Sequence, residues 1–105
     1  MTLKEELALV EKAKKDIRAF DKLYEYYLPR IFAYCYNRLA SRETAEDITS
    51  LVFVGAVEGL KMFDSEKGNK FGTWLYRVAH NKIVDHYRKK KPGLFGLMGN
   101  EEEEN

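Results

Sequence analysis

The chain has 105 residues, of which 45% are hydrophobic and 33% are charged, with one cysteine and two prolines. This length allows one domain with one modest core, and the composition favours helices over a loop-rich fold. The lone Cys35 cannot form an internal disulfide, and no Cys or His spacing suggests zinc, so we expect a buried structural thiol and no metal or other cofactor. No signal peptide and no membrane-spanning run is recognisable, which together with the cysteine usage predicts a cytoplasmic protein.

The charge is unevenly distributed along the chain, although the net charge is only +1. Residues 1–63 hold ten acidic and ten basic residues, whereas residues 76–91 hold six basic residues against one acidic residue, Asp85. Four consecutive glutamates follow at 101–104. A local excess of lysine and arginine is the electrostatic mark of a nucleic-acid-binding surface, which a global charge conceals.

The first half of the chain predicts two amphipathic helices, over about 2–15 and 17–39, because apolar residues recur there at helical spacing. Asp16 is a candidate N-cap for the second helix. Pro29 should kink or restart that helix, because proline removes a backbone donor and clashes with the preceding turn. The expected apolar stripe of the first helix is Leu3, Leu7 and Val10. That of the second is Ile17, Phe20, Leu23, Tyr24, Tyr27, Ile31, Phe32, Cys35 and Leu39.

The second half predicts two more helices joined by a polar turn over 64–69 that contains Gly68. Ser41 is a good N-cap for the third helix, and Phe71 or Gly72 opens the fourth, which Pro92-Gly93 should end. The third helix has the stripe Ala45, Ile48, Val52, Ala56, Leu60 and Phe63. The fourth should face inward with Leu75, Val78, Ala79, Ile83 and Tyr87. We therefore predict an all-α fold, a compact bundle of about four helices over residues 1–91, followed by a linker or flexible acidic tail over 92–105.

The stretch 63–91 is the strongest candidate for a binding surface. The aromatic residues Phe71, Trp74 and Tyr76 stand at its start, and a basic cluster stands at its end. Exposed aromatic faces beside positive charge suit unstacked bases on a phosphate backbone, which favours single-stranded over duplex nucleic acid. The alternative is that Phe71 and Trp74 are core residues and the basic residues form a solvated face. The polar side of the fourth helix would carry Arg77, Asn81, Asp85 and Arg88.

Two other features have a functional and a structural interpretation. Gly55 and Gly59 lie four residues apart in the third helix, so they permit close approach either of a partner helix or of a helix inside the bundle. His80 and His86 are six residues apart and face different sides of a helix, so they should not share a metal. No nucleophile motif or phosphate-binding loop is present, and we do not expect an enzyme.

Taken together, these residues resemble region two of bacterial RNA polymerase sigma factors, closest to the extracytoplasmic-function class. The resemblance covers roughly residues 20–91. Three blocks carry it: Phe20-Asp21-Lys22-Leu23-Tyr24 through Pro29-Arg30-Ile31-Phe32, then Ala45-Glu46-Asp47-Ile48-Thr49, then Phe71-Gly72-Thr73-Trp74-Leu75-Tyr76-Arg77-Val78-Ala79 through Asn81 to Asp85-His86-Tyr87-Arg88.

The resemblance implies a transcription initiation factor domain with two binding surfaces and no catalysed step. One surface would dock on the β′ clamp helices of the polymerase core through Asp47, Ser50, Leu51, Val54 and Glu58. The other would recognise and melt the minus-ten promoter element by holding its non-template strand, with bases flipped out of the duplex. Its expected residues are Ser65, Lys67, Asn69, Lys70, Phe71, Trp74, Arg77, His80, Asn81, Arg88 and Lys89. An anti-sigma factor is a further candidate partner.

The chain also departs from the family pattern. Ser50-Leu51 stand where the extracytoplasmic-function class usually has Gln-Glu, and Gly55 stands where that class commonly has a basic residue. Some other sigma classes often carry a glycine near this point. The alternative function is therefore a sigma-like helical protein-interaction module that has lost promoter binding. Nothing after Pro92 resembles region four, so we expect either a truncated chain or a separate partner that supplies that region, with truncation favoured.

Overall fold

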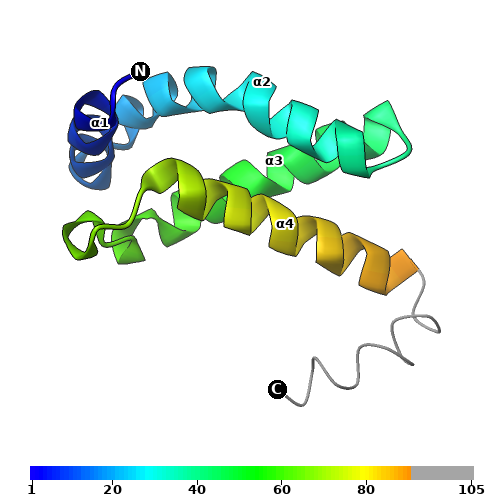
Figure 1. Ribbon diagram of the computed structural model, residues 1–105. Coiled ribbons are helices and arrows are strands. Elements are labelled where there is room, and N and C mark those ends of the chain that lie inside the picture. The colour runs from blue at the N-terminus through cyan, green and yellow to red at the C-terminus, as the bar shows by residue number, and fades with distance from the viewer. Residues whose placement is uncertain (91–105) are drawn as a thin grey trace, which may run out of the picture.

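The protein is described here by a computed structural model that covers residues 1–90, and within these residues every regular element is helical. The elements in chain order are α1 (Leu3–Lys15), η1 (Ile17–Ala19), α2 (Phe20–Arg38), α3 (Arg42–Gly59), η2 (Leu60–Met62), η3 (Ser65–Lys67) and α4 (Phe71–Lys90) (Figure 1). The predicted all-α bundle of four helices is confirmed. The expected stop at Pro92-Gly93 and the acidic tail lie outside the described residues.

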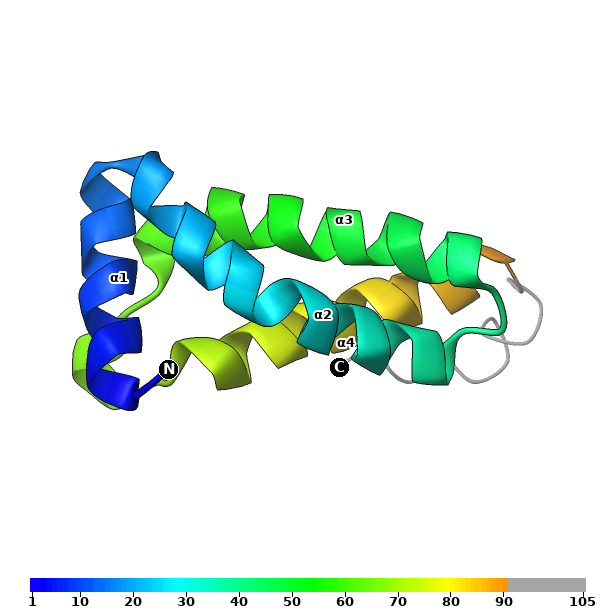
Figure 2. The same cartoon turned by 90° about the horizontal axis from the view of Figure 1, so that it is seen from above.

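The three long helices lie side by side, and α1 crosses one end of them (Figures 1 and 2). Helices α2 and α3 form an antiparallel pair through a short connection, and α4 then runs in the same direction as α2. None of the helices in residues 1–90 is both long and apolar enough to cross a membrane.

Side-chain caps fix where the helices begin. The Asp16 Oδ1 accepts a hydrogen bond from the Arg18 N–H at 3.1 Å, and the Ser41 Oγ accepts one from the Thr44 N–H at 3.2 Å. Both caps satisfy backbone donors that have no partner inside the helix. The predicted N-caps are therefore confirmed, with Asp16 capping the short 3₁₀ turn η1 that leads into α2.

The core lies between α2, α3 and α4 and is closed at one end by α1. All six residues of the stripe predicted for the third helix are buried, although Leu60 lies in η2 and Phe63 follows that element. Cys35 is fully buried as expected. Its burial raises the pKa of the Cys35 thiol. The largest fully buried side chains are Phe71, Leu23, Ile31, Leu60, Leu75, Val10, Val52 and Cys35.

Three residues predicted for the core are exposed instead: Leu3 at 50%, Ile17 at 52% and Tyr24 at 40%. In α1 the buried face is Glu6, Val10 and Ala13, and the carboxylate at the N-terminal end of this face obscured the apolar stripe. Glu6 is tolerated there because it accepts a hydrogen bond from the Tyr27 hydroxyl. Ile17 lies in η1, where the period of α2 has not yet begun.

Pro29 was predicted to kink or restart the second helix. The restart is wrong, because α2 continues unbroken from Phe20 to Arg38, and the kink stays a prediction. Pro29 leaves the carbonyl of Glu25 without its helical donor. Both residues are exposed, so water can satisfy that carbonyl at little cost. The proline therefore falls on the one side of the helix where it can be accommodated.

The glycine pair of α3 serves packing inside the bundle. A Cβ on Gly59 would lie 3.1 Å from the indole of Trp74, and a Cβ on Gly55 would lie 3.5 Å from side-chain atoms of Val78 and Lys82. All three neighbours belong to α4. Of the two interpretations of this pair, close approach of another helix of the same domain is the one the structure shows.

Candidate nucleic-acid and protein interfaces

A hollow of about 240 Å³ opens where the loop after η2 meets the start of α4. Its walls combine aromatic, basic and amide side chains. They are Met62, Phe63, Asp64, Lys67, Asn69, Lys70, Thr73, Trp74 and Arg77. Five of the residues predicted to bind DNA therefore meet in one concave place: Lys67, Asn69, Lys70, Trp74 and Arg77.

The loop that forms one side of the hollow is held by its own polar residues. Asp64 Oδ1 accepts from the Glu66 N–H at 2.9 Å, and Asn69 Nδ2 donates to the Asp64 carbonyl oxygen at 2.9 Å. Gly68 closes the turn with φ of 78°, a left-handed conformation that disfavours residues with a Cβ. The side-chain amide of Asn69 thus shapes the loop, whatever else it contacts.

Helix α1 fixes the same loop from behind. Lys14 Nζ donates to the Phe63 carbonyl oxygen at 2.6 Å, and Ser65 Oγ donates to Glu11 Oε2 at 3.1 Å. The hydroxyl of Ser65 is therefore engaged with a carboxylate, which repels phosphate. Of the predicted DNA-binding residues in the loop, Ser65 is the one whose surroundings suit a phosphate least.

Phe71 is a correction to the predicted contact set. Its side chain is fully buried and packs edge-to-face on Phe20, Tyr27 and Phe63, with ring centroids 5.7 to 6.3 Å apart. A base cannot reach a ring in this position. The core interpretation therefore holds for Phe71, which lies 5.6 Å from the half-buried Trp74 and supports it from below.

The outward side of α4 continues the basic surface away from the hollow. Arg77, His80, Asn81 and Lys89 are exposed, and Arg88 is half-buried. Asp85 is also exposed and reduces the positive charge of this side. His86 packs edge-to-face on Tyr87 at 5.5 Å, apart from His80, and residues 1–90 contain no group of three or more potential metal ligands.

The outward side of α3 is apolar where a surface helix would normally be polar. Leu51, Val54 and Val57 are 50%, 53% and 40% exposed, although each belongs to an apolar residue type. The predicted polymerase-binding residues Asp47, Ser50 and Glu58 are exposed around them. Ser50 Oγ donates to the Glu46 carbonyl oxygen at 3.2 Å, so its hydroxyl is engaged within the helix. Exposed apolar residues that gather in this way are typical of interaction surfaces.

This apolar side of α3 continues into a groove of about 680 Å³ between η1, α2 and α3. Ile17, Tyr24 and Val57 line it together with Val54 and Glu58. Sequence reasoning had assigned Ile17 and Tyr24 to the core and had not singled out Val57. The available signal was a second apolar row in α3, at positions 51, 54 and 57, opposite the row that fills the core.

Met62 is another residue that sequence reasoning missed. It is 86% exposed at the edge of the hollow. A large apolar side chain two residues before a polar turn was the signal that could have found it. Its thioether is polarisable and makes favourable contacts with aromatic rings, so it can extend the apolar lining of the hollow toward a bound base.

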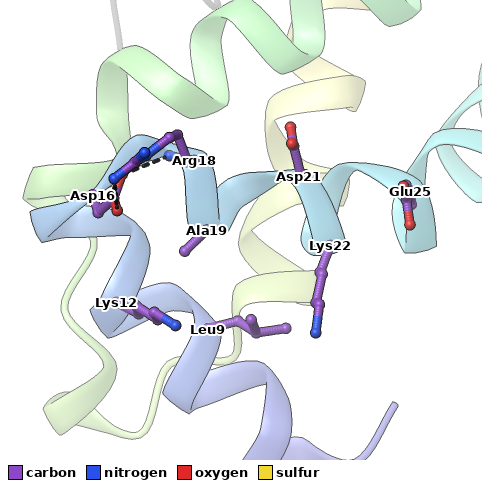
Figure 3. A pocket seen from close by; sticks show the side chains of 8 residues that line it. All are labelled: Leu9, Lys12, Asp16, Arg18, Ala19, Asp21, Lys22 and Glu25. Atoms are coloured by element: carbon purple, nitrogen blue, oxygen red, sulfur yellow. Dashed lines mark hydrogen bonds and ion pairs between the residues drawn. The ribbon is translucent and has the colours of Figure 1, made fainter.

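A different hollow, between α1, η1 and α2, has no comparable chemistry (Figure 3). Acidic and basic side chains alternate around it. Arg18 holds Asp16 through two hydrogen bonds, at 3.1 Å to Oδ1 and 3.0 Å to Oδ2. The Arg18 side chain and backbone N–H lower the pKa of the Asp16 carboxyl. The charges of this region neutralise one another locally, and no single ligand chemistry is favoured.

Residues 23–92, more than half of the chain, match the model of the family described as sigma-70 region 2. The chain is 37% identical over 95 residues to the ECF RNA polymerase sigma factor SigW of Bacillus subtilis, covering 90% of this chain and 49% of that protein. It is 35% identical over 86 residues to the ECF RNA polymerase sigma factor BldN of Streptomyces coelicolor, covering 81% and 32%. It is 30% identical over 105 residues to the RNA polymerase sigma-28 factor of Bacillus thuringiensis, covering 94% and 43%.

The chain therefore belongs to the sigma-70 region 2 family. It spans half or less of the length of these relatives. The resemblance to the extracytoplasmic-function class, drawn from three sequence blocks, is confirmed by the likeness to SigW and BldN. Sigma factors are transcription initiation factors and not enzymes.

Proposed function

We propose that this chain is the part of a transcription initiation factor that docks on RNA polymerase through α3 and holds one strand of promoter DNA on α4 and the preceding loop. The observation that supports DNA binding is the hollow at the start of α4. There the half-buried ring of Trp74 adjoins Lys67, Lys70 and Arg77. This combination supports capture of an unstacked base together with its neighbouring phosphates.

The energetics favour a strand that has already left the duplex. Extracting a base costs a few kcal/mol, and stacking on an aromatic side chain returns about 1–3 kcal/mol per base. Arg77, Asn81 and Lys89 extend along the exposed side of α4, where contacts to phosphates would add a salt-dependent contribution. The domain would thus stabilise melted promoter DNA, and the polymerase would carry out the chemistry.

The protein half of the proposal depends on the outward side of α3. Leu51 and Val54 supply an apolar centre, and Asp47 and Glu58 flank it with negative charge. An apolar centre with charged surroundings is the usual composition of a transient protein interface. The predicted partner is the β′ clamp helices. An anti-sigma factor, a separate region-four protein and a cytoplasmic location remain predictions.

The alternative, a sigma-like module that kept the protein contact and lost DNA binding, would use the same exposed apolar row in α3. The same row serves both functions, so only a DNA measurement separates them. Titration of a labelled single strand carrying the minus-ten element, with wild type and Arg77→Ala, makes this separation. No strand binding by a chain that binds the polymerase fragment would favour the alternative.

The test of the proposal is calorimetric titration of the chain with a purified fragment of the β′ clamp helices. Asp47→Lys should weaken binding at least tenfold, which corresponds to about 1.4 kcal/mol. Glu25→Lys is the matched control, because it makes the same charge change at an exposed position of α2. Equal binding by the folded Asp47→Lys and Glu25→Lys variants would remove Asp47 from the interface, and no binding by wild type would overturn the docking proposal.

A further inference from the structure

A regular pattern of tyrosine and arginine runs along α2. Tyr26, Arg30, Tyr34 and Arg38 recur at intervals of four residues, so they form one stripe on the helix, here called the Tyr–Arg stripe. The Arg30 Cζ lies 3.8 Å from the centre of the Tyr26 ring, and the Arg38 Cζ lies 3.6 Å from the centre of the Tyr34 ring. The stripe therefore consists of two equivalent units, each a guanidinium stacked on a ring.

Each guanidinium is held in the same way. Arg30 Nη1 donates to the Tyr26 carbonyl oxygen at 2.6 Å, and Arg38 Nη1 donates to the Tyr34 carbonyl oxygen at 3.1 Å. One N–H group is used in this bond, and a guanidinium has five. Both arginines are exposed while both tyrosines are half-buried. The stacking thus orients two planar cations toward solvent at a reduced cost in side-chain entropy.

Neither of these two arginines forms an ion pair within residues 1–90. The ion pairs among residues 1–90 involve Lys14, Arg18, Arg42 and Lys67, and no carboxylate of these residues lies within 4.0 Å of the Arg30 or Arg38 guanidinium. Stacked pairs at this spacing also stabilise an isolated helix, by about 0.2–0.5 kcal/mol each. A role in helix stability would not explain why neither arginine has an acidic partner within residues 1–90.

The stripe is joined to α4, which carries the proposed DNA surface. The Tyr34 and Tyr76 rings meet edge-to-face at 5.3 Å, and the Tyr87 hydroxyl donates to the Arg38 carbonyl oxygen at 2.7 Å. Helices α2 and α4 run alongside each other in the same direction (Figure 1). The stripe therefore lies beside α4 in a fixed position rather than on an independent part of the molecule.

We propose that the Tyr–Arg stripe is a second phosphate-binding track for single-stranded nucleic acid, on which Arg30 and Arg38 each contact one phosphate. This inference rests on the proposed function, because the strand is the one that α4 would hold. The two arginines are separated by eight residues, or about 12 Å along the helix. A planar guanidinium matches phosphate in a bidentate manner. A short strand that fills only the hollow would not reach these arginines, whereas a longer strand would reach both.

The experiment compares a single strand of about 5 nucleotides with one of about 15 nucleotides. Binding is followed by NMR titration of the isotope-labelled chain at several salt concentrations, since this method also detects weak complexes. The test variant is Arg30→Gln/Arg38→Gln. The matched control is Lys4→Gln/Lys15→Gln, which removes two exposed cations from α1. Circular dichroism establishes that each variant is folded.

For the long strand, the salt slope of log affinity should fall by about 1.4 in the test variant, which is about 0.7 for each lost phosphate contact. It should not change in the control variant, and the short strand should bind both like wild type. Arg30→Lys/Arg38→Lys should keep the salt slope but bind the long strand several-fold more weakly, because lysine lacks the planar fork. A role in helix stability alone would leave the salt slope of a folded variant unchanged.

An unchanged slope in the test variant, while Arg77→Ala weakens both strands, would overturn the stripe and leave the proposed function standing. If the wild-type chain binds neither the short nor the long strand, both the Tyr–Arg stripe proposal and the proposed function are overturned. A synthetic peptide with the sequence of residues 99–105 provides the remaining comparison. If the test variant loses affinity for that glutamate-rich peptide but not for the long strand, the stripe binds acidic protein segments and the nucleic-acid track is overturned.

Discussion

Trp74 of α4 rests on the backbone of α3 at Gly59, where an added Cβ would lie 3.1 Å from Cζ2 of the indole. The same indole lies 5.3 Å from the ring of Phe63 and 5.6 Å from the ring of Phe71. Contacts from three sides therefore determine where the ring stands in the wall of the hollow. The shape of the candidate DNA site depends on how closely two helices approach.

Gly59→Ala should move Trp74, whereas Gly55→Ala should not. A Cβ at 3.1 Å requires the indole to shift by a few tenths of an ångström, while one at 3.5 Å makes an ordinary contact. Gly55→Ala should raise the free energy of unfolding by about 0.5–1 kcal/mol through helix propensity, and Gly59→Ala should raise it less or lower it. Denaturant unfolding measures both changes.

Trp74 is the only tryptophan of the chain, so its fluorescence reports on this contact directly. We expect a shifted emission maximum for folded Gly59→Ala and a wild-type spectrum for Gly55→Ala. Identical spectra and equal stability gains for the two variants would contradict the close contact between Gly59 and the indole.

A second prediction concerns Gly72 and Tyr27. A Cβ on Gly72 would stand 2.5 Å from the Tyr27 hydroxyl oxygen, so Gly72→Ala should lower the free energy of unfolding by about 1–3 kcal/mol through overpacking. In Tyr27→Phe the nearest atom becomes Cζ at 3.3 Å. The glycine substitution should therefore cost less in that background, and a double-mutant cycle should give a coupling of about 0.5–3 kcal/mol. Strictly additive costs would contradict this packing.

Helix number, order and caps could be predicted from the sequence because they depend on local rules. Ser41 and Asp16 cap where expected, and the α3 stripe is buried at every predicted position. The predictions that failed concern features that depend on tertiary contacts. The hydrogen bond from Tyr27 places Glu6 in the core, and nothing in the spacing of α1 indicates that a residue of α2 would provide it.

The candidate site could be predicted only in part for a similar reason. Lys67, Asn69, Lys70, Trp74 and Arg77 were found because they cluster in sequence. Phe71 was assigned to DNA because an aromatic residue in a basic segment can serve either as core or as a stacking surface, and only burial distinguishes these. The predicted polymerase-binding set omitted Val57, because the exposure of this side chain depends on what packs against it.

A third prediction follows from the ionisation of Tyr27. Burial, and then its hydrogen bond to the Glu6 carboxylate, raise the pKa of the Tyr27 phenol. The folded chain keeps this proton at a pH where the unfolded chain, with a tyrosine pKa of about 10, loses it. The unfolding free energy should therefore be unaffected by this group below about pH 10 and should decline as the pH rises further.

Denaturant unfolding from about pH 9 to pH 12 measures this decline. Tyr27→Phe should make the slope of stability against pH shallower above about pH 10. Tyr36→Phe changes a tyrosine that is 50% exposed and is the matched control. Equal slopes for wild type and Tyr27→Phe would contradict a raised pKa at this position.

A fourth prediction concerns Met62, which is 86% exposed at the edge of the hollow. If its thioether packs on a captured base, Met62→Ala should weaken the binding of a labelled single strand by about two- to tenfold, corresponding to a contact of about 0.3–1.5 kcal/mol. Stability should change by less than about 0.5 kcal/mol, since the side chain makes little contact with the domain. Fluorescence anisotropy measures the affinity.

Two further variants separate this contact from a general loss of apolar surface. Met62→Leu keeps most of the apolar volume and should retain most of the affinity. Leu51→Ala removes a side chain that is 50% exposed on α3 and outside the lining of the hollow, and it should bind the strand like wild type. Equal affinities for Met62→Ala and Leu51→Ala would show that Met62 does not contact the strand. The hollow would then bind its base through Trp74 and the surrounding basic residues alone.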